Sequence, residues 1–150
     1  MRQVVGLQRA VPCARPQWMA RRRPRGSKGL GLRYEAALAR ALPSALHNPW
    51  YEYLDANGPG WASPDILTKY RGHVVVLECK LTDIAAAEAQ LQELYFPIVE
   101  LVYGLPAKGI VVVRSLVTRP DPSRVVTSLA AALAAPGVPI WHWLGAGAPL

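Results

Sequence analysis

Residues 63–80 read S-P-D-I-L-T-K-Y-R-G-H-V-V-V-L-E-C-K, and this stretch predicts a β-hairpin at the centre of the fold. Residues 66–70 and 73–80 are rich in aliphatic, β-branched and aromatic side chains, which is typical of strands. The run of Val and Leu in the second segment is typical of a strand that is buried on both faces. Arg71-Gly72 between the two segments is a turn signal, because Gly adopts positive φ without steric cost.

The register that follows from this turn gathers charged side chains at the open end of the hairpin. Asp65 is expected opposite Glu78, and directly opposed side chains have Cβ atoms roughly 4.5–5.5 Å apart. Lys80 follows Glu78 by two residues and so points to the same face, whereas Cys79 points to the other. Two adjacent carboxylates repel each other and are costly to bury without a partner. Mg²⁺ or Mn²⁺ removes this conflict and also accepts phosphate oxygens, so the pattern indicates metal-assisted chemistry on a phosphate ester.

The motif Pro64-Asp65 followed by Glu78-Cys79-Lys80 resembles the PD-(D/E)xK nuclease superfamily. Two further stretches resemble its RecB-like and lambda-exonuclease-like branches, and the resemblance covers about residues 29–115. The first stretch is G-L-R-Y-E, which ends at Glu35 in the first expected helix, where these branches place an acidic residue. The second is A-Q-L-Q-E-L-Y, where they place a Gln and a Tyr with three residues between them. This chain departs from that spacing, because two residues separate Gln92 from Tyr95 and four separate Gln90 from Tyr95.

The resemblance implies a metal-dependent deoxyribonuclease that hydrolyses phosphodiester bonds, as in recombination, repair or phage DNA processing. Asp65 and Glu78 are the expected metal ligands, with the main-chain carbonyl of Cys79 as a third oxygen. Lys80 is expected to orient or deprotonate the attacking water, and Glu35 to hold a metal-bound water or a second ion. The expected cofactor is Mg²⁺ or Mn²⁺.

The helical Gln and Tyr residues depart from the spacing of the family, so more than one role is open for them. Gln90 or Gln92 is expected to hydrogen-bond the scissile phosphate or the attacking water, and Tyr95 is either a core residue or a functional one. The expected partner is DNA, with exonuclease or endonuclease action, strand structure and homo-oligomeric state left open. The alternative function is a non-catalytic nucleic-acid-binding module with a nuclease-like fold. A third interpretation is an unrelated α/β protein in which the motif is accidental.

The positive charge is concentrated at the N-terminus. Residues 1–28 contain eight Arg or Lys residues and no acidic residue, whereas the other 122 residues contain nine basic and ten acidic residues. We therefore expect 1–28 to be a flexible basic arm and 29–150 a single nuclease domain. Phosphate contacts by counterion release are expected from five side chains of the arm, namely Arg21, Arg22, Arg23, Arg25 and Lys28. A solvated leader, a start at Met19 and a mitochondrial presequence are the alternatives.

The rest of the pattern predicts an α/β fold. Its αβββαβ core would have a mixed central sheet flanked by helices, which is restriction-endonuclease-like by resemblance, followed by a C-terminal helix and strand. No apolar run is long enough for a transmembrane helix and the two cysteines make no disulfide framework, so we expect no membrane partner and a cytoplasmic location in a bacterial or phage-infected cell. The expected helices are 29–42, 83–103 with a kink at Pro97, and 121–134; the expected strands are 50–54, 66–70, 73–80, 110–113 and an edge strand at 140–144, with a loop at 55–60.

Aromatic residues are concentrated just before the hairpin. Trp50, Tyr51, Tyr53 and Trp61 all lie within twelve residues. Bases of unpaired nucleic acid stack on such side chains. Packing within the protein is the interpretation that we favour for them.

Overall fold

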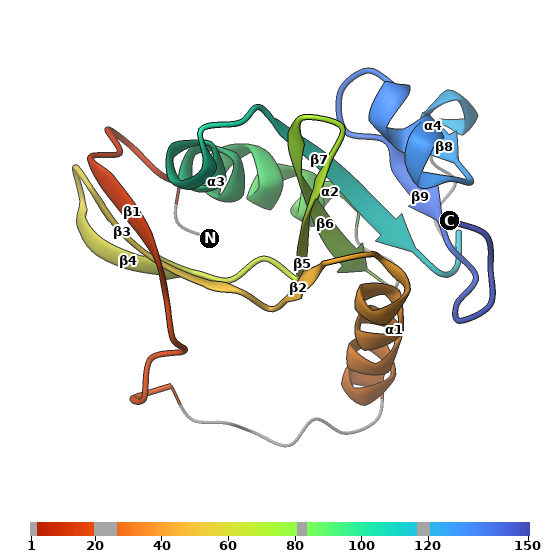
Figure 1. Cartoon of the computed structure of the whole chain (residues 1–150), viewed down its shortest axis with the longest axis horizontal. Helices are drawn as coiled ribbons and strands as arrows, with labels where there is room; N and C mark the ends of the chain where they lie inside the picture. The colour runs from red at the N-terminus through yellow and green to blue at the C-terminus, as the bar shows by residue number, and fades with distance from the viewer. Residues whose placement is uncertain (1–2, 20–26, 81–83, 117–120) are drawn as a thin grey trace.

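The central element is a six-stranded mixed sheet with helices on both faces (Figure 1). The structure is a computed structural model that describes residues 3–19, 27–80, 84–116 and 121–150. The strand order of the central sheet is β2–β5–β6–β7–β9–β8, and a second sheet has the order β1–β3–β4. The α/β class with a mixed, helix-flanked sheet is thus confirmed. The elements are β1 Arg9–Cys13, α1 Ser27–Ala41, β2 Leu46–His47, β3 Trp50–Asp55, β4 Gly58–Ala62, β5 Ile66–Tyr70, β6 His73–Lys80, α2 Ile84–Gln90, the π-helical turn η1 Leu91–Tyr95, α3 Phe96–Tyr103, β7 Ala107–Val113, the 3-10 turn η2 Pro122–Arg124, β8 Val125–Val126, α4 Leu129–Ala134 and β9 Ile140–His142.

The hairpin of β5 and β6 forms with the predicted turn and register. Tyr70 pairs with His73 across the turn, and the antiparallel pairing continues to Ile66 and Leu77. Arg71 and Gly72 both have positive φ, 47° and 78°, as a type I′ hairpin turn requires. On its other side β6 pairs in parallel with β7, and β9 and β8 continue the sheet in parallel.

The two faces of β6 pack against different helices, which fixes where each of its side chains points. Val74 and Val76 belong to a hydrophobic cluster with residues of α2, η1 and α3. Val75 and Leu77 belong to a second cluster with residues of α1 and α4. All four side chains are fully buried, as expected for a central strand. By the same alternation Glu78 belongs to the α2 face, and Cys79 packs against the cluster on the α1 face.

The expected flexible arm is wrong for residues 9–13, which form strand β1. This strand pairs antiparallel with β3, from Arg9 opposite Leu54 to Cys13 opposite Trp50. The amino-acid composition of β1 did not indicate a strand, because β1 is mostly exposed and is held by main-chain pairing rather than by an apolar face. The expected loop at 55–60 is also shorter, since β4 begins at Gly58 and pairs with β3.

The predicted helix up to Tyr103 is present, and a π-helical turn that was not expected, η1, interrupts it just before Pro97. In η1 the main-chain N–H of Phe96 bonds to the carbonyl of Leu91, five residues earlier. Pro97 follows at once and has no N–H to donate to the carbonyl of Glu93. That carbonyl instead accepts the N–H of Val4, at 3.0 Å, which ties the N-terminal segment to the helix.

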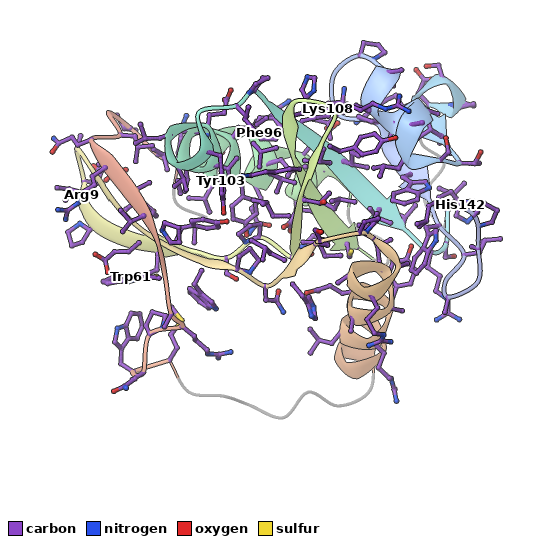
Figure 2. The ribbon with its side chains drawn as sticks, in the orientation of Figure 1. Arg9, Trp61, Phe96, Tyr103, Lys108 and His142 are labelled. Atoms are coloured by element: carbon purple, nitrogen blue, oxygen red, sulfur yellow. The ribbon has the colours of Figure 1, made fainter. Side chains whose placement is uncertain are left out.

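The helix and the sheet come close together at Gly109 of β7. A Cβ atom at this position would lie 2.5 Å from Cζ of Phe96 and 3.1 Å from Cδ1 of Leu91. Phe96 lies over the central sheet at the level of β7 (Figure 2). Glycine therefore lets the start of η1 and the start of α3 rest directly on the strand.

The C-terminal prediction is wrong in two respects. Asp121 caps only the short turn η2, accepting the N–H of Ser123, and the helix α4 begins later, after its own N-cap Ser128. Between them β8 pairs with β9, so β9 is an interior strand rather than the expected edge strand. Two-residue strands such as β8 leave no periodic pattern to detect. No helix among the described residues has both the length and the apolar character needed to span a membrane.

Candidate metal and catalytic site

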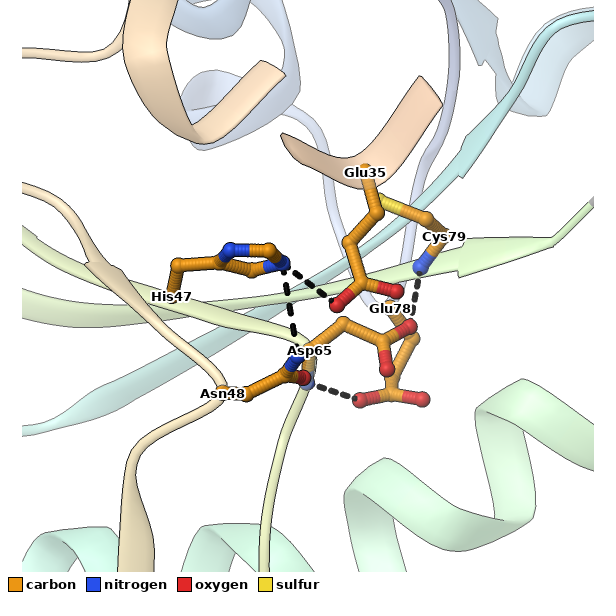
Figure 3. A network of polar contacts seen from close by, with 6 residues as sticks. All are labelled: Glu35, His47, Asn48, Asp65, Glu78 and Cys79. Atoms are coloured by element: carbon orange, nitrogen blue, oxygen red, sulfur yellow. Dashed lines mark hydrogen bonds and ion pairs between the residues drawn. The ribbon is translucent and has the colours of Figure 1, made fainter. Parts of the chain in front are cut away.

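Two hydrogen bonds hold Asp65 and Glu78 at the open end of the hairpin: Glu78 accepts the main-chain N–H of Asp65, and Asp65 accepts that of Cys79, the residue after Glu78. The N–H of Cys79 donates to Oδ2 of Asp65 at 2.8 Å, and the N–H of Asp65 donates to Oε1 of Glu78 at 3.0 Å (Figure 3). Both bonds follow from the register, which sets these residues opposite each other one step beyond the Ile66–Leu77 pair. The predicted convergence of the two carboxylates is therefore present.

Helix α1 brings a third carboxylate, that of Glu35, to the same place. Its neighbour Tyr34 fixes the helix by donating a 2.6 Å hydrogen bond to the main-chain carbonyl of Trp143. Glu35 is only 6% exposed, and its carboxyl group points toward those of Asp65 and Glu78 (Figure 3). The site thus combines the hairpin with a helix on the opposite face of the sheet.

His47 and Asn48 complete the polar network, although their sequence pattern gave no reason to include them. Nε2 of His47 lies 2.9 Å from Oε1 of Glu35, and Nδ2 of Asn48 lies 3.3 Å from the same ring nitrogen. The main-chain N–H of Asn48 donates to the carbonyl of Asp65 at 2.8 Å. β2 places them there by pairing with the start of β5, and a two-residue strand leaves little signal in the sequence.

Burial and mutual repulsion make the three carboxyl groups hard to ionise together. Burial, with the Asp65 charge next, raises the pKa of Glu35 to about 8. Burial likewise raises the pKa of Glu78, and the Asp65 charge adds to the effect. Burial also raises the pKa of Asp65, against the lowering effect of the Cys79 N–H and of Lys80. A positive charge at this point would be strongly favoured.

Lys80 points to the same side as Glu78, as predicted. Its Nζ lies 4.0 Å from Oε2 of Glu78, and the side chain is 32% exposed. The thiol of Cys79 lies on the other face, and burial raises its pKa well above the ordinary value. The thiol is therefore neutral, which leaves the main-chain carbonyl as the ligand to consider at this residue.

The π-helical turn brings Gln90, rather than Gln92, to Tyr95. Nε2 of Gln90 donates to the Tyr95 hydroxyl at 2.9 Å, and this hydroxyl donates to the carbonyl of Ser63 at 3.0 Å. A π-helical turn has one residue more than an α-helical turn, so residues five apart share a face. The spacing of five between Gln90 and Tyr95 is thus equivalent to four in a regular helix, whereas Gln92 is exposed.

Hydrogen bonds connect this pair to the carboxylates through the chain before Asp65. The Tyr95 hydroxyl holds Ser63, which precedes Asp65 by two residues. Burial raises the pKa of Tyr95, with the Glu78 charge next in effect, so the hydroxyl stays neutral. Tyr95 is 4% exposed and packs in the core, which confirms the core role, and its functional role stays a prediction.

The predicted phosphate contacts fall largely outside the described residues. This holds for Arg21, Arg22, Arg23 and Arg25. Lys28 lies in the first turn of α1, but its side chain is outside the described part of the structure. Their roles stay predictions.

The donor set available for a metal is small and rich in oxygen. The described residues contain no group of three or more His, Cys, Asp and Glu side chains with the geometry to hold a metal ion. Asp65 and Glu78 with the carbonyl of Cys79 offer instead two carboxylates and one main-chain oxygen. Mg²⁺ is typically bound in this way, by one or two carboxylates with several waters and substrate phosphates, so these residues fit Mg²⁺ or Mn²⁺ better than a closed Zn²⁺ site.

Comparison with known proteins does not assign the chain to a family. No protein-family model matches it, and no match is found among curated proteins or among solved structures. Its function therefore has to be inferred from the geometry of its own residues.

Proposed function

We propose that the chain is a metal-dependent deoxyribonuclease of the PD-(D/E)xK superfamily with a restriction-endonuclease-like fold. The observation that carries the proposal is the pair of main-chain hydrogen bonds, from Asp65 to Glu78 and from Cys79 to Asp65, that holds the two carboxylates at the end of the hairpin. Lys80 on the same face and Glu35 from α1 add the other groups that such a site needs. An accidental motif has no reason to gather three buried carboxyl groups, because burying them together is unfavourable without a cation.

Each residue has a definable task in this proposal. Asp65, Glu78 and the carbonyl of Cys79 would hold Mg²⁺ or Mn²⁺, which when bound would supply charge stabilisation to the phosphate and the leaving oxygen. Lys80, partly exposed beside Glu78, can donate hydrogen bonds that orient the attacking water. Glu35, paired with His47 and with its pKa near 8, can hold or accept a proton close to neutral pH.

The direct test is a cleavage assay with labelled single-stranded, duplex and branched DNA. We expect cleavage with Mg²⁺ or Mn²⁺ and none with EDTA, and the DNA form that is cut identifies the substrate. Binding of DNA without cleavage under every ion condition would contradict the proposal and support a non-catalytic binding module instead. The absence of both binding and cleavage would contradict both functions.

Gln90 and Gln92 form a matched pair for testing the helical part of the site. Replacing Gln90 by Ala removes the donor to Tyr95 and should lower the cleavage rate about 3–10-fold, the range for one hydrogen bond between neutral groups. Replacing the exposed Gln92 by Ala should leave the rate within about twofold. Single-turnover rates at saturating ion measure both. Equal effects of the two substitutions would contradict the role given to the π-helical turn.

A further inference from the structure

A groove of about 660 Å³ opens beside the carboxylates, between β4 and the π-helical turn. Its lining includes Asn48, which bonds to the main chain of Asp65, and Ser63, which precedes Asp65 by two residues. Gln90 and Tyr95 line it from the helix. A second hollow of about 420 Å³ shares Trp61, Gln90 and Leu94 with it and continues along β4 to Pro59 and Gly60. The groove therefore begins next to the segment that carries Asp65 and continues along β4.

Two tryptophans, Trp50 and Trp61, line this groove, and a third, Trp18, packs against Trp61. In β3 the alternate residues Tyr51 and Tyr53 are buried, as packing requires, whereas Trp50 is half-buried and lines the groove. Trp61 is 36% exposed and lies on β4, an edge strand of the β1–β3–β4 sheet (Figure 2). Trp18 is 66% exposed and meets Trp61 edge to face, with ring centroids 5.4 Å apart.

Polar groups of the type that bind nucleotides accompany these rings. The guanidinium of Arg15 lies over the ring of Trp50, at 5.9 Å from its centroid, and lines the groove. Asn48 and Gln90 contribute amides, which can both donate to and accept from base edges. Flat apolar faces, one cation and two amides match the chemistry of an unpaired base with its phosphate.

We propose that this groove binds unpaired bases of a single DNA strand whose adjoining phosphate lies at Asp65 and Glu78. The inference rests on the proposed nuclease function and specifies its substrate as single-stranded DNA or the unpaired end of a duplex. The volume lies within the range of about 300–1,000 Å³ that is common for small-ligand sites, which suits one or two bases. Bases in an intact duplex are stacked on each other and cannot occupy such a groove without being extruded.

Binding measured in EDTA tests the groove independently of cleavage. The probe is a fluorescein-labelled oligothymidylate followed by anisotropy, with a blunt duplex of equal length and an oligomer of abasic residues as competitors. We expect the unlabelled oligothymidylate to compete much better than either, because the abasic oligomer keeps the phosphates but lacks the bases. Equal competition by the abasic oligomer would overturn the proposal.

Two matched pairs of substitutions locate the binding. Trp61→Ala should weaken binding of the oligothymidylate about tenfold or more, and Trp61→Phe should restore most of the loss because a ring is kept. Arg15→Gln should weaken binding more than Arg71→Gln, which removes a cation from an equivalent arrangement over Tyr70 at the hairpin turn. Unchanged binding by Trp61→Ala, or equal effects of the two Arg substitutions, would overturn the proposal.

The two proposals fail separately. If the wild type cleaves DNA but Trp61→Ala binds the oligothymidylate as well as the wild type does, the proposed nuclease function stands and the groove is not the base-binding site. If binding depends on bases and on Trp61 but no cleavage occurs at any ion concentration, base binding in the groove is supported and the nuclease function is contradicted.

Discussion

Replacing Asp65 by Asn is expected to lower the rate of Mg²⁺-dependent DNA cleavage by at least about 10³-fold while the protein stays folded. The amide keeps an oxygen that can accept the N–H of Cys79, so the hairpin end retains its geometry. The substitution removes the charge that the proposed cation needs. It also removes a repulsive neighbour of Glu78 and Glu35, so the metal-free variant should melt at the same temperature as the wild type or higher.

The combination of lost activity and retained stability separates a metal ligand from a structural residue. Glu93→Gln is a suitable control, because it removes one negative charge from an exposed side chain of the same domain. The control should cleave at the wild-type rate. Cleavage by Asp65→Asn within tenfold of the wild type would contradict the assignment of Asp65, and so would a marked fall in its melting temperature.

Lys80→Ala separates the role proposed for Lys80, which is to orient water, from metal binding by the carboxylates. It should reduce cleavage by a comparable factor, since the group proposed to orient water is lost. The two carboxylates remain in this variant, so a rise in melting temperature on adding Mn²⁺ should persist, whereas Asp65→Asn should lose most of it. A thermal shift assay with and without Mn²⁺ measures this difference.

The features that the sequence predicted correctly are those with a strict local period. The turn at Arg71-Gly72 sets the register of β5 and β6, and a period of two then decides that Glu78 and Lys80 share a face. Asp65 could therefore be placed opposite Glu78 without knowledge of the rest of the chain. Glu35 needed the resemblance as well, because periodicity places it on α1 but does not say where α1 lies.

The features that it could not predict depend on contacts distant in sequence. β1 is held by pairing with β3, some forty residues later, and its basic neighbours suggested an arm. The π-helical turn lies where Pro97 has no N–H to donate to the carbonyl of Glu93. The N–H of Val4, from the far end of the chain, donates to that carbonyl instead. His47 joins Glu35 only because β2 pairs with β5. None of these partners lies within a window that local patterns cover.

The aromatic residues before the hairpin have two different environments, although they look alike in the sequence. Tyr51 and Tyr53 are buried, which confirms the packing interpretation for them. Trp50 and Trp61 line a groove instead. The alternation of β3 accounts for the difference in that strand, but the sequence did not show which face was covered.

Divalent ions are expected to raise the melting temperature more at pH 8 than at pH 5. The pKa of Glu35 is about 8 in the folded protein, against an ordinary value of 4.5. Between these values the unfolded chain has already lost the proton that the folded protein keeps, so stability falls as pH rises. Below pH 4.5 the protonated group stabilises the fold fully, and above pH 8 that contribution is gone. Burial raises the pKa of Glu78 and Asp65 in the same direction.

Without metal, the expected fall in stability as pH rises is large. Each pKa unit corresponds to about 1.4 kcal/mol, so these groups together lower the free energy of unfolding by several kcal/mol, or about 10 °C in melting temperature for a chain of this size. Mg²⁺ or Mn²⁺ binds the ionised carboxylates and so competes with protons, which makes its stabilising effect small at low pH and large at high pH. Melting curves from pH 5 to 8, with EDTA or with Mn²⁺, measure both trends. Glu35→Gln should flatten the metal-free trend and Glu93→Gln should not, whereas an ion effect that shrinks as pH rises would contradict a carboxylate site for the metal.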